Sequence, residues 1–322
     1  MRKILKGNRI ISILITNLFR SISTINKSSV VLLSLHSHME QDNWSNVIKS
    51  NSAFSLSSIK EVWHYRDLLW MFVKRDIVTN YKQTVLGPLW FFIQPILTML
   101  MYVVIFNRVA NIQTPVSPVL FYLSGIAAWN YFSECLNKTS STFKDNAYIF
   151  GKVYFPRLIL PLSIIVSNLL KFAIQFSLFI VALAYFMFIE KAPLQPSIYI
   201  LLVPVLIFIM AGLGLGLGMI ITSLTTKYRD LTFLVQFGVQ LLMYATPVIY
   251  PLSKVSGSRL EPFIFANPMT TVMETFRVAF LGTDKGVFNW IHILYSVLVS
   301  VILLIVGFYI FNNTEKTFTD TV

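Results

Sequence analysis

The chain has 322 residues, of which 55% are hydrophobic and only 12% charged, and its mean hydropathy is +0.68. Soluble domains carry roughly 25% charged residues, so this composition excludes an ordinary soluble protein and indicates a membrane protein. The formal net charge of +12 would suit nucleic-acid binding if the cations formed one patch, but their distribution favours another explanation. The single cysteine, Cys135, cannot form an internal disulfide.

Residues 1–58 are expected to form an N-terminal cytoplasmic extension. The apolar run Ile10–Phe19 is too short to span a bilayer and lacks the small-residue cleavage site of a signal peptide. Met39 opens a stretch that reads like a natural start, MEQDNWSNVIKS. We therefore hypothesise that residues 1–38 are dispensable, with the polar stretch that follows leading into the first helix.

Residues 59–86 are predicted to form an amphipathic helix that lies in the membrane surface. One helical face carries apolar residues at steps of three and four, and the other is polar and cationic; the first set is Trp70, Val73, Ile77, Tyr81 and Val85, and the second Lys74, Arg75, Thr79, Lys82 and Gln83. The alternative is a soluble amphipathic helix beside a buried core helix. The equally apolar remainder of the chain disfavours it.

Residues 87–312 are predicted to cross the membrane six times, which gives an all-α membrane protein with a tail at 313–322. The uncharged runs are about Leu89–Phe106, Val116–Leu136, Leu158–Phe188, Ile198–Leu224, Leu231–Tyr250 and Phe288–Phe311. In the first run Trp90, Gln94, Thr98 and Tyr102 recur every fourth residue; in the fifth, Gln236, Gln240 and Tyr244 do the same. Such stripes either line a polar path or hold helices together by hydrogen bonds, and the sequence leaves both open.

The Lys and Arg residues outside these runs alternate in density. Of 26, 12 precede Leu89, and seven follow in alternate segments: Lys138, Lys144, Lys152, Arg157, Lys227, Arg229 and Lys316. The other connections hold Arg108, Lys191, Lys254, Arg259, Arg277 and Lys285, and Lys171 lies within the third run. Because Lys and Arg favour cytoplasmic loops, both termini are expected in the cytoplasm, and the charge is explained without nucleic acid.

The basic segment from Lys138 to Arg157 is predicted to contain a short helix that begins after Ser140 or Ser141 and ends at Gly151. Phe143, Ala147 and Phe150 share one face of that helix, between Lys144 and Lys152, with Tyr154 beyond. We expect an exposed aromatic ridge that docks into a groove of a soluble partner. The alternative is a solvated connector. The basic loop Thr225–Asp230 is a possible second contact.

Two features inside the spans need protein neighbours. Lys171, with Ser167 and Gln175 on the same helical face, must face protein or water, since a charge at mid-membrane costs at least about 2.5 kcal/mol. In the fourth run the pairs Gly212/Gly216 and Gly214/Gly218 are overlapping small-xxx-small motifs, which predict close helix packing.

The connection before the last span is predicted to form a re-entrant outer hairpin. Asn267-Pro268 is a helix-start signal and Gly282 a helix-stop signal. The segment between them is apolar on one face, but Glu274 and Arg277 make a full crossing costly.

No catalytic constellation, metal site or cofactor site is predicted. The four histidines are His36, His38, His64 and His292, and only the first two are neighbours. The Gly-Lys pair Gly151-Lys152 lacks the glycine and the Ser or Thr of a nucleotide-binding loop. If the chain transports actively, a separate subunit must therefore supply the energy.

The motifs together resemble the type 2 ABC exporter permeases that move polysaccharides such as O-antigen, capsule or teichoic acid. The resemblance covers about Ser57 to Phe311 and rests on RDLLWMFVKRDIVTNYKQTVLGPLWFFIQP, FYLSGIAAWNYF, NAYIFGKVYFPRLILPLS, KYRDL and TPVIYP. It implies a homodimer of six-span subunits with two copies of a separate ATPase, in the bacterial cytoplasmic membrane. It further implies that Arg66–Leu86 is a gate helix, that Ser141–Phe155 is the coupling helix that enters the ATPase, and that Pro262–Gly282 forms re-entrant helices near the exit. Related chains often have an acid where this one has Lys171, which leaves structural pairing and substrate contact both open.

The expected function is therefore export of a lipid-linked polysaccharide. The cationic residues Lys74, Arg75 and Lys82 of the gate helix would attract a diphosphate, and sugars would pass along the aromatic and amide stripes. The main alternative is a permease of the same fold for a drug or small lipid, since a fold does not fix its substrate. A membrane glycosyltransferase or acyltransferase and a non-energised channel are further alternatives.

Overall fold

The computed structural model of the chain describes residues 61–82, 84–150, 152, 155–228, 230–255, 257–282 and 288–318. Every regular element in these ranges is helical, which confirms the all-α prediction. The expectations for residues 1–58 and for the last four residues lie outside the described part of the chain. All described residues belong to a unit that begins at Ser52.

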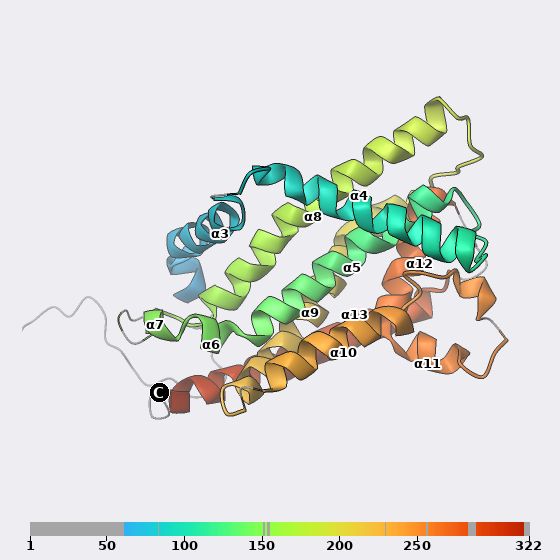
Figure 1. Cartoon of the computed structure of the whole chain (residues 1–322). Helices are drawn as coiled ribbons and strands as arrows, with labels where there is room; N and C mark the ends of the chain where they lie inside the picture. Colours follow the sequence, from blue (N-terminus) through green and yellow to red (C-terminus); the bar gives the residue numbers. More distant parts are fainter. Residues whose placement is uncertain are drawn as a thin grey trace, which may run out of the picture. The chain divides into compact units, whose positions relative to one another are not determined.

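The helices follow one another with few long connections (Figure 1). Their bounds are α3 Arg66–Tyr81, η1 Gly87–Leu89, α4 Trp90–Tyr102, the π-helix η2 Val103–Val109, α5 Pro118–Ser140, α6 Thr142–Asp145, α7 Ala147–Phe150, α8 Ile159–Phe188, η3 Ile198–Leu202, α9 Val203–Thr225, α10 Leu231–Ala245, η4 Leu252–Lys254, α11 Glu261–Ala266, α12 Pro268–Leu281 and α13 Trp290–Phe318. Proline stands in the first turn of α5, α9, α11 and α12, where its missing N–H costs no helical hydrogen bond.

Four helical segments in the described chain are long and apolar enough to cross a bilayer: Gly87–Val109, Ile159–Phe188, Ile198–Thr225 and Trp290–Thr314. The other two predicted spans differ from these for separate reasons. The 23-residue α5 carries Asn130, Glu134 and Lys138 in its second half. The apolar α10 has 15 residues, about 22 Å of helix, because Thr246 before Pro247 is extended. The count of six crossings therefore stays a prediction.

Helix α9 packs between α5 and α13, and its glycines make both contacts close. A Cβ on Gly214 would lie 2.7 Å from Cβ of Cys135 on α5, and one on Gly216 would lie 2.6 Å from the backbone carbon of Leu303 on α13. Gly307 of α13 approaches the same turn of α9, since its own Cβ would lie 2.5 Å from the carbonyl oxygen of Gly216. The structure confirms the predicted close packing and shows that the two glycine pairs face different helices.

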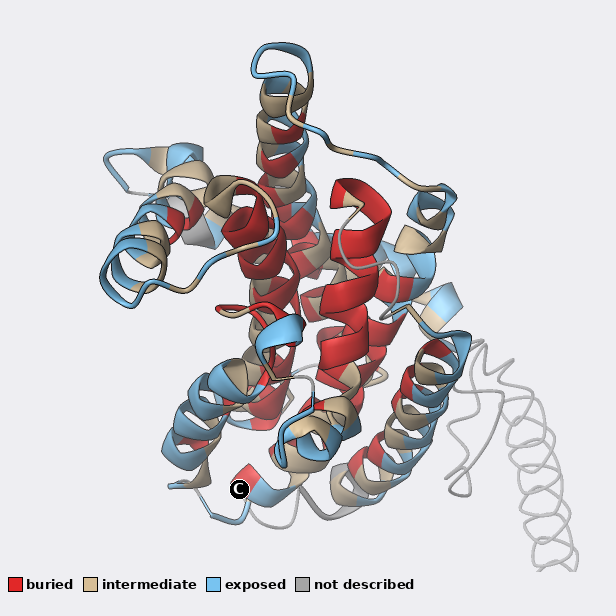
Figure 2. Ribbon diagram, turned by 90° about the vertical axis from the view of Figure 1, so that its right-hand side faces the viewer, coloured by how far each residue is buried: buried red, intermediate tan, exposed pale blue. Residues whose placement is uncertain are grey.

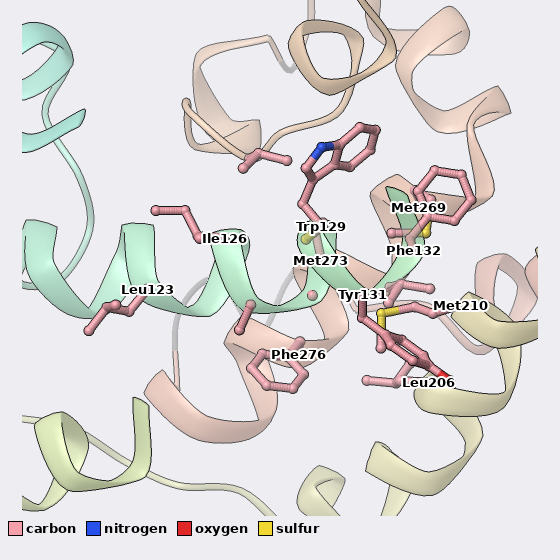
Figure 3. Close-up of a cluster of buried hydrophobic side chains, with 14 of the residues drawn as sticks. Leu123, Ile126, Trp129, Tyr131, Phe132, Leu206, Met210, Met269, Met273 and Phe276 are labelled. Carbon is pink, nitrogen blue, oxygen red and sulfur yellow. The ribbon is translucent and has the colours of Figure 1, made fainter. Parts of the chain in front are cut away.

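The main core lies where α5, α9 and α12 meet. Figure 2 shows the buried residues gathered in the helices at the middle of the bundle. The side chains labelled in Figure 3 come from these three helices, with Trp129 and Phe132 on α5, Met210 on α9 and Met273 and Phe276 on α12. Interdigitated aromatic and methionine side chains of this kind fill the space between helices that meet at different angles.

Helix α12 is enclosed by the rest of the chain, and each residue from Met269 to Leu281 is buried. Its ends match the predicted signals. The Asn267 side chain accepts a hydrogen bond from the Met269 N–H at 3.0 Å, and Gly282 ends the helix with φ +69°. A side chain at Gly282 would also meet the carbonyl oxygen of Gln195 at 2.6 Å.

Arg277 joins α12 to α5 and to the end of α10. It is 1% exposed, and its Nη1 donates to the Pro247 carbonyl at 2.6 Å and to Glu274 at 3.1 Å. Its Nη2 donates to the Val248 carbonyl at 2.9 Å, and its Cζ lies 3.7 Å from the centre of the Phe121 ring. The buried charge is thus paired, hydrogen-bonded and stacked, as burial of an ion requires.

Candidate functional site

The predicted coupling segment forms two short helices, α6 and α7, that separate at Asn146. The prediction that Phe143 is exposed is wrong, because this side chain is 0% exposed. Its ring stacks on Phe311 of α13, with centroids 4.6 Å apart and an interplanar angle of 16°. Its N–H donates to Oγ1 of Thr222 on α9 at 3.3 Å. The apolar face of α6 is therefore used inside the chain, where α9 and α13 cover it.

The outward face of the same segment carries a different set of side chains. Lys144, Asp145, Tyr148 and Lys152 are exposed, with Tyr148 at 65%. Ala147 and Phe150 are half-buried. Tyr154, also predicted here, lies outside the described residues. The described surface open to a partner thus carries two lysines, one aspartate and one tyrosine, rather than a ridge of phenylalanines.

Helix α3, the predicted gate helix, packs against the start of α8. Phe72 and Val73 are buried there, together with Phe155 and Ile159. Of the predicted apolar stripe, Val73 is buried and Ile77 half-buried, whereas Trp70 is 58% exposed. The face of α3 that packs on the rest of the chain is therefore rotated about the helix axis, away from the predicted stripe and toward Phe72.

The cationic residues of the gate helix have different surroundings. Lys74 is exposed, and so is Lys82, which follows the helix. Arg75 is half-buried, because its Nη2 lies 2.8 Å from Oδ1 of Asp76 and its Cζ lies 4.8 Å from the centre of the Phe72 ring. The Tyr81 side chain lies outside the described part. The structure thus keeps Lys74 and Lys82 accessible, while Arg75 contributes to packing.

Lys171 of α8 points at an acid of α5. Its Nζ lies 2.8 Å from Oε2 of Glu134, and the Lys138 ammonium lies 3.6 Å from the same oxygen. Lys171 is 8% exposed and borders a water-sized cavity that is also lined by Asn130, Tyr131, Glu134, Asn168, Phe172 and Gln175. The arrangement neutralises the intramembrane charge by protein, which favours structural pairing. The signal for this pair in the sequence was that Glu134 and Lys171, which have opposite charges, lie at similar depths in neighbouring predicted spans.

The two predicted stripes remain largely open to the outside of the described chain. Gln94 on α4 and Gln236, Gln240 and Tyr244 on α10 are exposed, and Trp90 is 46% exposed. Tyr102 is half-buried and donates to the sulfur of Met243 at 3.5 Å, so the two helices approach at that point. Within the described residues, none of the three glutamines makes a side-chain hydrogen bond to another helix.

Several residues of these sites were missed by reasoning from the sequence. Phe311 and Thr222 hold the coupling segment, and Phe155 links it to α3. No local signal identifies them, because each acts through a contact that forms only when distant helices pack. Thr225 is similar: its hydroxyl donates to the Ser140 carbonyl at 2.8 Å, which ties the end of α9 to the end of α5.

Comparison with known proteins gives consistent similarities over most of the chain. It is 30% identical over 266 residues to the O-antigen export system permease protein RfbA of Myxococcus xanthus, which covers 82% of this chain and 98% of the relative. It is 29% identical over 255 residues to the protein of the same name from Klebsiella pneumoniae, covering 79% and 94%. It is 22% identical over 258 residues to the capsule polysaccharide export inner-membrane protein CtrC of Neisseria meningitidis, covering 78% and 92%.

The domain described as ABC-2 type transporter matches residues 67–281, a range that runs from α3 through α12 and includes the coupling segment. This match covers more than half of the chain. The apolar helices that can cross a bilayer agree with it. The chain is thus a multi-pass membrane permease, and it belongs to the ABC-2 type transporter family.

Proposed function

We propose that this chain is the permease subunit of an exporter that moves a lipid-linked, O-antigen-like polysaccharide across the bacterial cytoplasmic membrane. The observation that carries the proposal is the 30% identity to an O-antigen export permease that is matched over 98% of its length. A separate ATPase subunit supplies the energy, since the chain contains no nucleotide-binding loop of its own.

The subunit crosses the membrane six times and has both termini in the cytoplasm. This topology follows the excess of Lys and Arg in alternate connections, which includes Lys144 and Lys152 of the coupling segment. In this topology α5 and α10 cross the membrane in addition to the four clearly apolar helical segments, which gives six spans. Helices α11 and α12 enter the outer leaflet as a re-entrant hairpin. The buried ion pair of Arg277 and Glu274 supports the hairpin, because both charges are satisfied by protein.

The ATPase docks on the exposed side of α6 and α7. Lys144 and Lys152 provide charge there, and the open ring of Tyr148 can enter a groove on the partner. The packing of α6 on the rest of the chain supports this role, because Phe143 contacts Phe311 and Thr222 on the side opposite to the docking face.

Two copies of the chain assemble around the translocation path. The exposed amides of Gln94, Gln236 and Gln240 support this, because an amide that faces hydrocarbon without a partner is costly. Water and sugar hydroxyls in a path between two copies satisfy these groups, while Trp90 and Tyr244 offer surfaces on which sugar rings stack. The diphosphate of the lipid carrier enters beside Lys74 and Lys82 of the gate helix.

Deletion of the gene in its host tests the substrate class. We expect the lipid-linked glycan to accumulate inside the cell and to disappear from the surface, with both effects reversed by the intact gene. Normal surface glycan, with loss of resistance to a drug or a changed lipid distribution instead, would support the small-substrate alternative. Co-purification with an ATPase subunit in stoichiometric amount tests the second part of the proposal and excludes a channel or a free-standing enzyme.

A further inference from the structure

Five phenylalanine rings form a continuous row from α13 to α3. The ring of Phe311 stacks on Phe143 at 4.6 Å, and Phe143 lies 5.8 Å from Phe150. Phe150 stacks on Phe155 at 5.8 Å with an interplanar angle of 26°, and Phe155 lies 5.7 Å from Phe72. All four centroid distances fall within the 4.5–7 Å range of favourable aromatic pairs. The row thus connects the last helix, the coupling segment and the gate helix.

Phe150 is the ring that the two halves of this row share. On one side Phe143 and Phe311 form a cluster with Leu215 and Met219. On the other side Phe72 and Phe155 form a cluster with Ile159 and Leu160. The rings at both ends are at most 4% exposed, whereas Phe150 is half-buried and packs against both clusters.

Two guanidinium groups lie over rings of the row. Cζ of Arg157 lies 5.2 Å from the centre of Phe150, and Cζ of Arg75 lies 4.8 Å from the centre of Phe72. Arg75 is itself held by Asp76. Such cation–π contacts favour one orientation of each ring and so limit independent rotation.

The backbone provides no continuous rod along the same route. Helix α6 ends at Asp145 and α7 begins at Ala147, and between them Asn146 has φ −115° and ψ 14°. A displacement of α7 is therefore not carried to α6 by unbroken helical hydrogen bonds. Packed side chains with discrete arrangements carry displacements between separate elements.

We propose that this phenylalanine row transmits the displacement of the coupling segment to the gate helix α3 and to α13 together, with Phe150 as the positioning residue between them. The proposal rests on the proposed function, in which an ATPase pushes on α6 and α7. Its consequence is that the gate helix moves with the nucleotide state of the ATPase. This holds although the ATPase docks on α6 and α7 and the accessible cations Lys74 and Lys82 are proposed to lie at the membrane surface.

The test uses the full permease with its ATPase subunit in lipid nanodiscs, labelled with an environment-sensitive fluorophore. Asp145→Cys reports on the coupling segment and Asp67→Cys on the gate helix, because both side chains are exposed and neither belongs to the docking or gate cations; the native Cys135 is fully buried and does not compete for the label. With a non-hydrolysable ATP analogue, both labels should respond in the otherwise unmodified chain. Phe150→Leu should reduce the response of the label at Asp67→Cys at least roughly threefold and preserve the response of the label at Asp145→Cys.

Matched variants separate the row from general packing. Phe150→Tyr keeps the ring and should restore the gate response. Phe176→Leu removes a half-buried ring that contacts Phe172, Phe179, Phe276 and Phe280 outside the row, and it should leave both responses intact. Phe72→Leu interrupts the row at its α3 end. Its combination with Phe150→Leu should lose no more of the gate-helix response than either single variant loses.

An unchanged response at Asp67→Cys in both Phe150→Leu and Phe72→Leu would overturn the proposed transmission through the phenylalanine row. So would loss of both responses together in these variants, because the rings would then serve docking rather than transmission. No nucleotide response at Asp145→Cys in the otherwise unmodified chain would instead overturn the proposed function, and with it the proposed transmission through the phenylalanine row.

Discussion

The Lys171 ammonium lies 2.8 Å from the Glu134 carboxylate and thereby joins α8 to α5, the two helices that flank the coupling segment. Lys171 is the single charged residue of the 30-residue α8, so this pair decides whether that helix carries an uncompensated charge into the membrane. Glu134 has a second cation, Lys138, at 3.6 Å. Glu134 therefore keeps a cationic partner when Lys171 is removed, whereas Lys171 loses its ion-pair partner when Glu134 is removed.

Glu134→Gln should destabilise the protein more than Lys171→Met. Removal of the acid leaves the buried Lys171 ammonium without its partner, which we expect to cost roughly 1–3 kcal/mol, below the range for a fully buried pair because the Glu134 side chain is 39% exposed. Removal of the lysine leaves Glu134 paired with Lys138. Thermal unfolding in detergent measures both, and the exposed Lys144→Met serves as control. Equal losses in the two single variants would contradict the inequality.

Gly216→Ala should be strongly destabilising, and Gly238→Ala should not. A methyl group on Gly216 would lie 2.6–2.8 Å from the backbone of Leu303 and Leu304, so α9 and α13 must separate, at a cost of about 1–3 kcal/mol. Nothing lies within 4 Å of a Cβ on Gly238 of α10, where alanine only improves helix propensity. The melting temperatures of the two variants check this contrast; similar values would show that the close approach of α9 and α13 is not required.

Phe143→Ala and Tyr148→Ala should fail in different ways. Loss of the fully buried Phe143 ring should reduce stability by about 3–5 kcal/mol. Loss of the ring of Tyr148, a residue that is 65% exposed, should leave the melting temperature unchanged and reduce the amount of ATPase subunit that co-purifies. Lys144→Glu with Lys152→Glu should also weaken that association, most clearly at low salt. If Tyr148→Ala retained full ATPase binding, the docking face would have to lie elsewhere.

Charge reversal of Lys74 and Lys82 should lower export without unfolding the protein. Both side chains are exposed, and each basic group near an anionic surface contributes about 1 kcal/mol, so reversal of both should reduce initial export several-fold or more. Arg75→Glu is a contrasting variant: it disrupts the contacts with Asp76 and Phe72 and should lower stability as well. Surface glycan per folded permease is the measurement. Unchanged export after reversal of Lys74 and Lys82 would refute their role at the gate.

Gln236→Leu with Gln240→Leu should impair export of the polysaccharide while the protein stays folded. Both amides are exposed on α10, and leucine suits a lipid-facing position at least as well as glutamine. Phe233→Leu on the same helix, 74% exposed, is the control. Cross-linking of the two copies measures assembly in parallel. Full export by the double variant would mean that these amides do not line the path.

Local signals allowed part of this structure to be predicted. The ends of α12 follow from Asn267, Pro268 and Gly282, because capping depends on residues adjacent in sequence. The glycine pairs of α9 predicted close contacts for a similar reason: their spacing places each pair on one helical face. Which helix each pair meets could not be predicted, since that depends on how α5 and α13 pack.

The error at Phe143 has a specific cause. An apolar face on a short cytoplasmic helix is typical both of a docking ridge and of a helix that covers its own protein. The predicted last span already reached Phe311, but nothing in the sequence indicates that its ring packs on Phe143 of α6. For Arg277 the sequence predicted only that a full membrane crossing would be costly; its partners, the Pro247 and Val248 carbonyls, could not be predicted because they come from another part of the chain.

The glycine contacts on both sides of α9 restrict which parts of the permease can slide. Where backbones touch directly, as at Gly216 and Gly307, few side chains remain that could switch rotamer and let one helix shift past its neighbour. Helices α5, α9 and α13 are then expected to travel as one block through the transport cycle. If a path widens during transport, we expect α4 and α10 to move, because each of these helices has only two buried residues among those described.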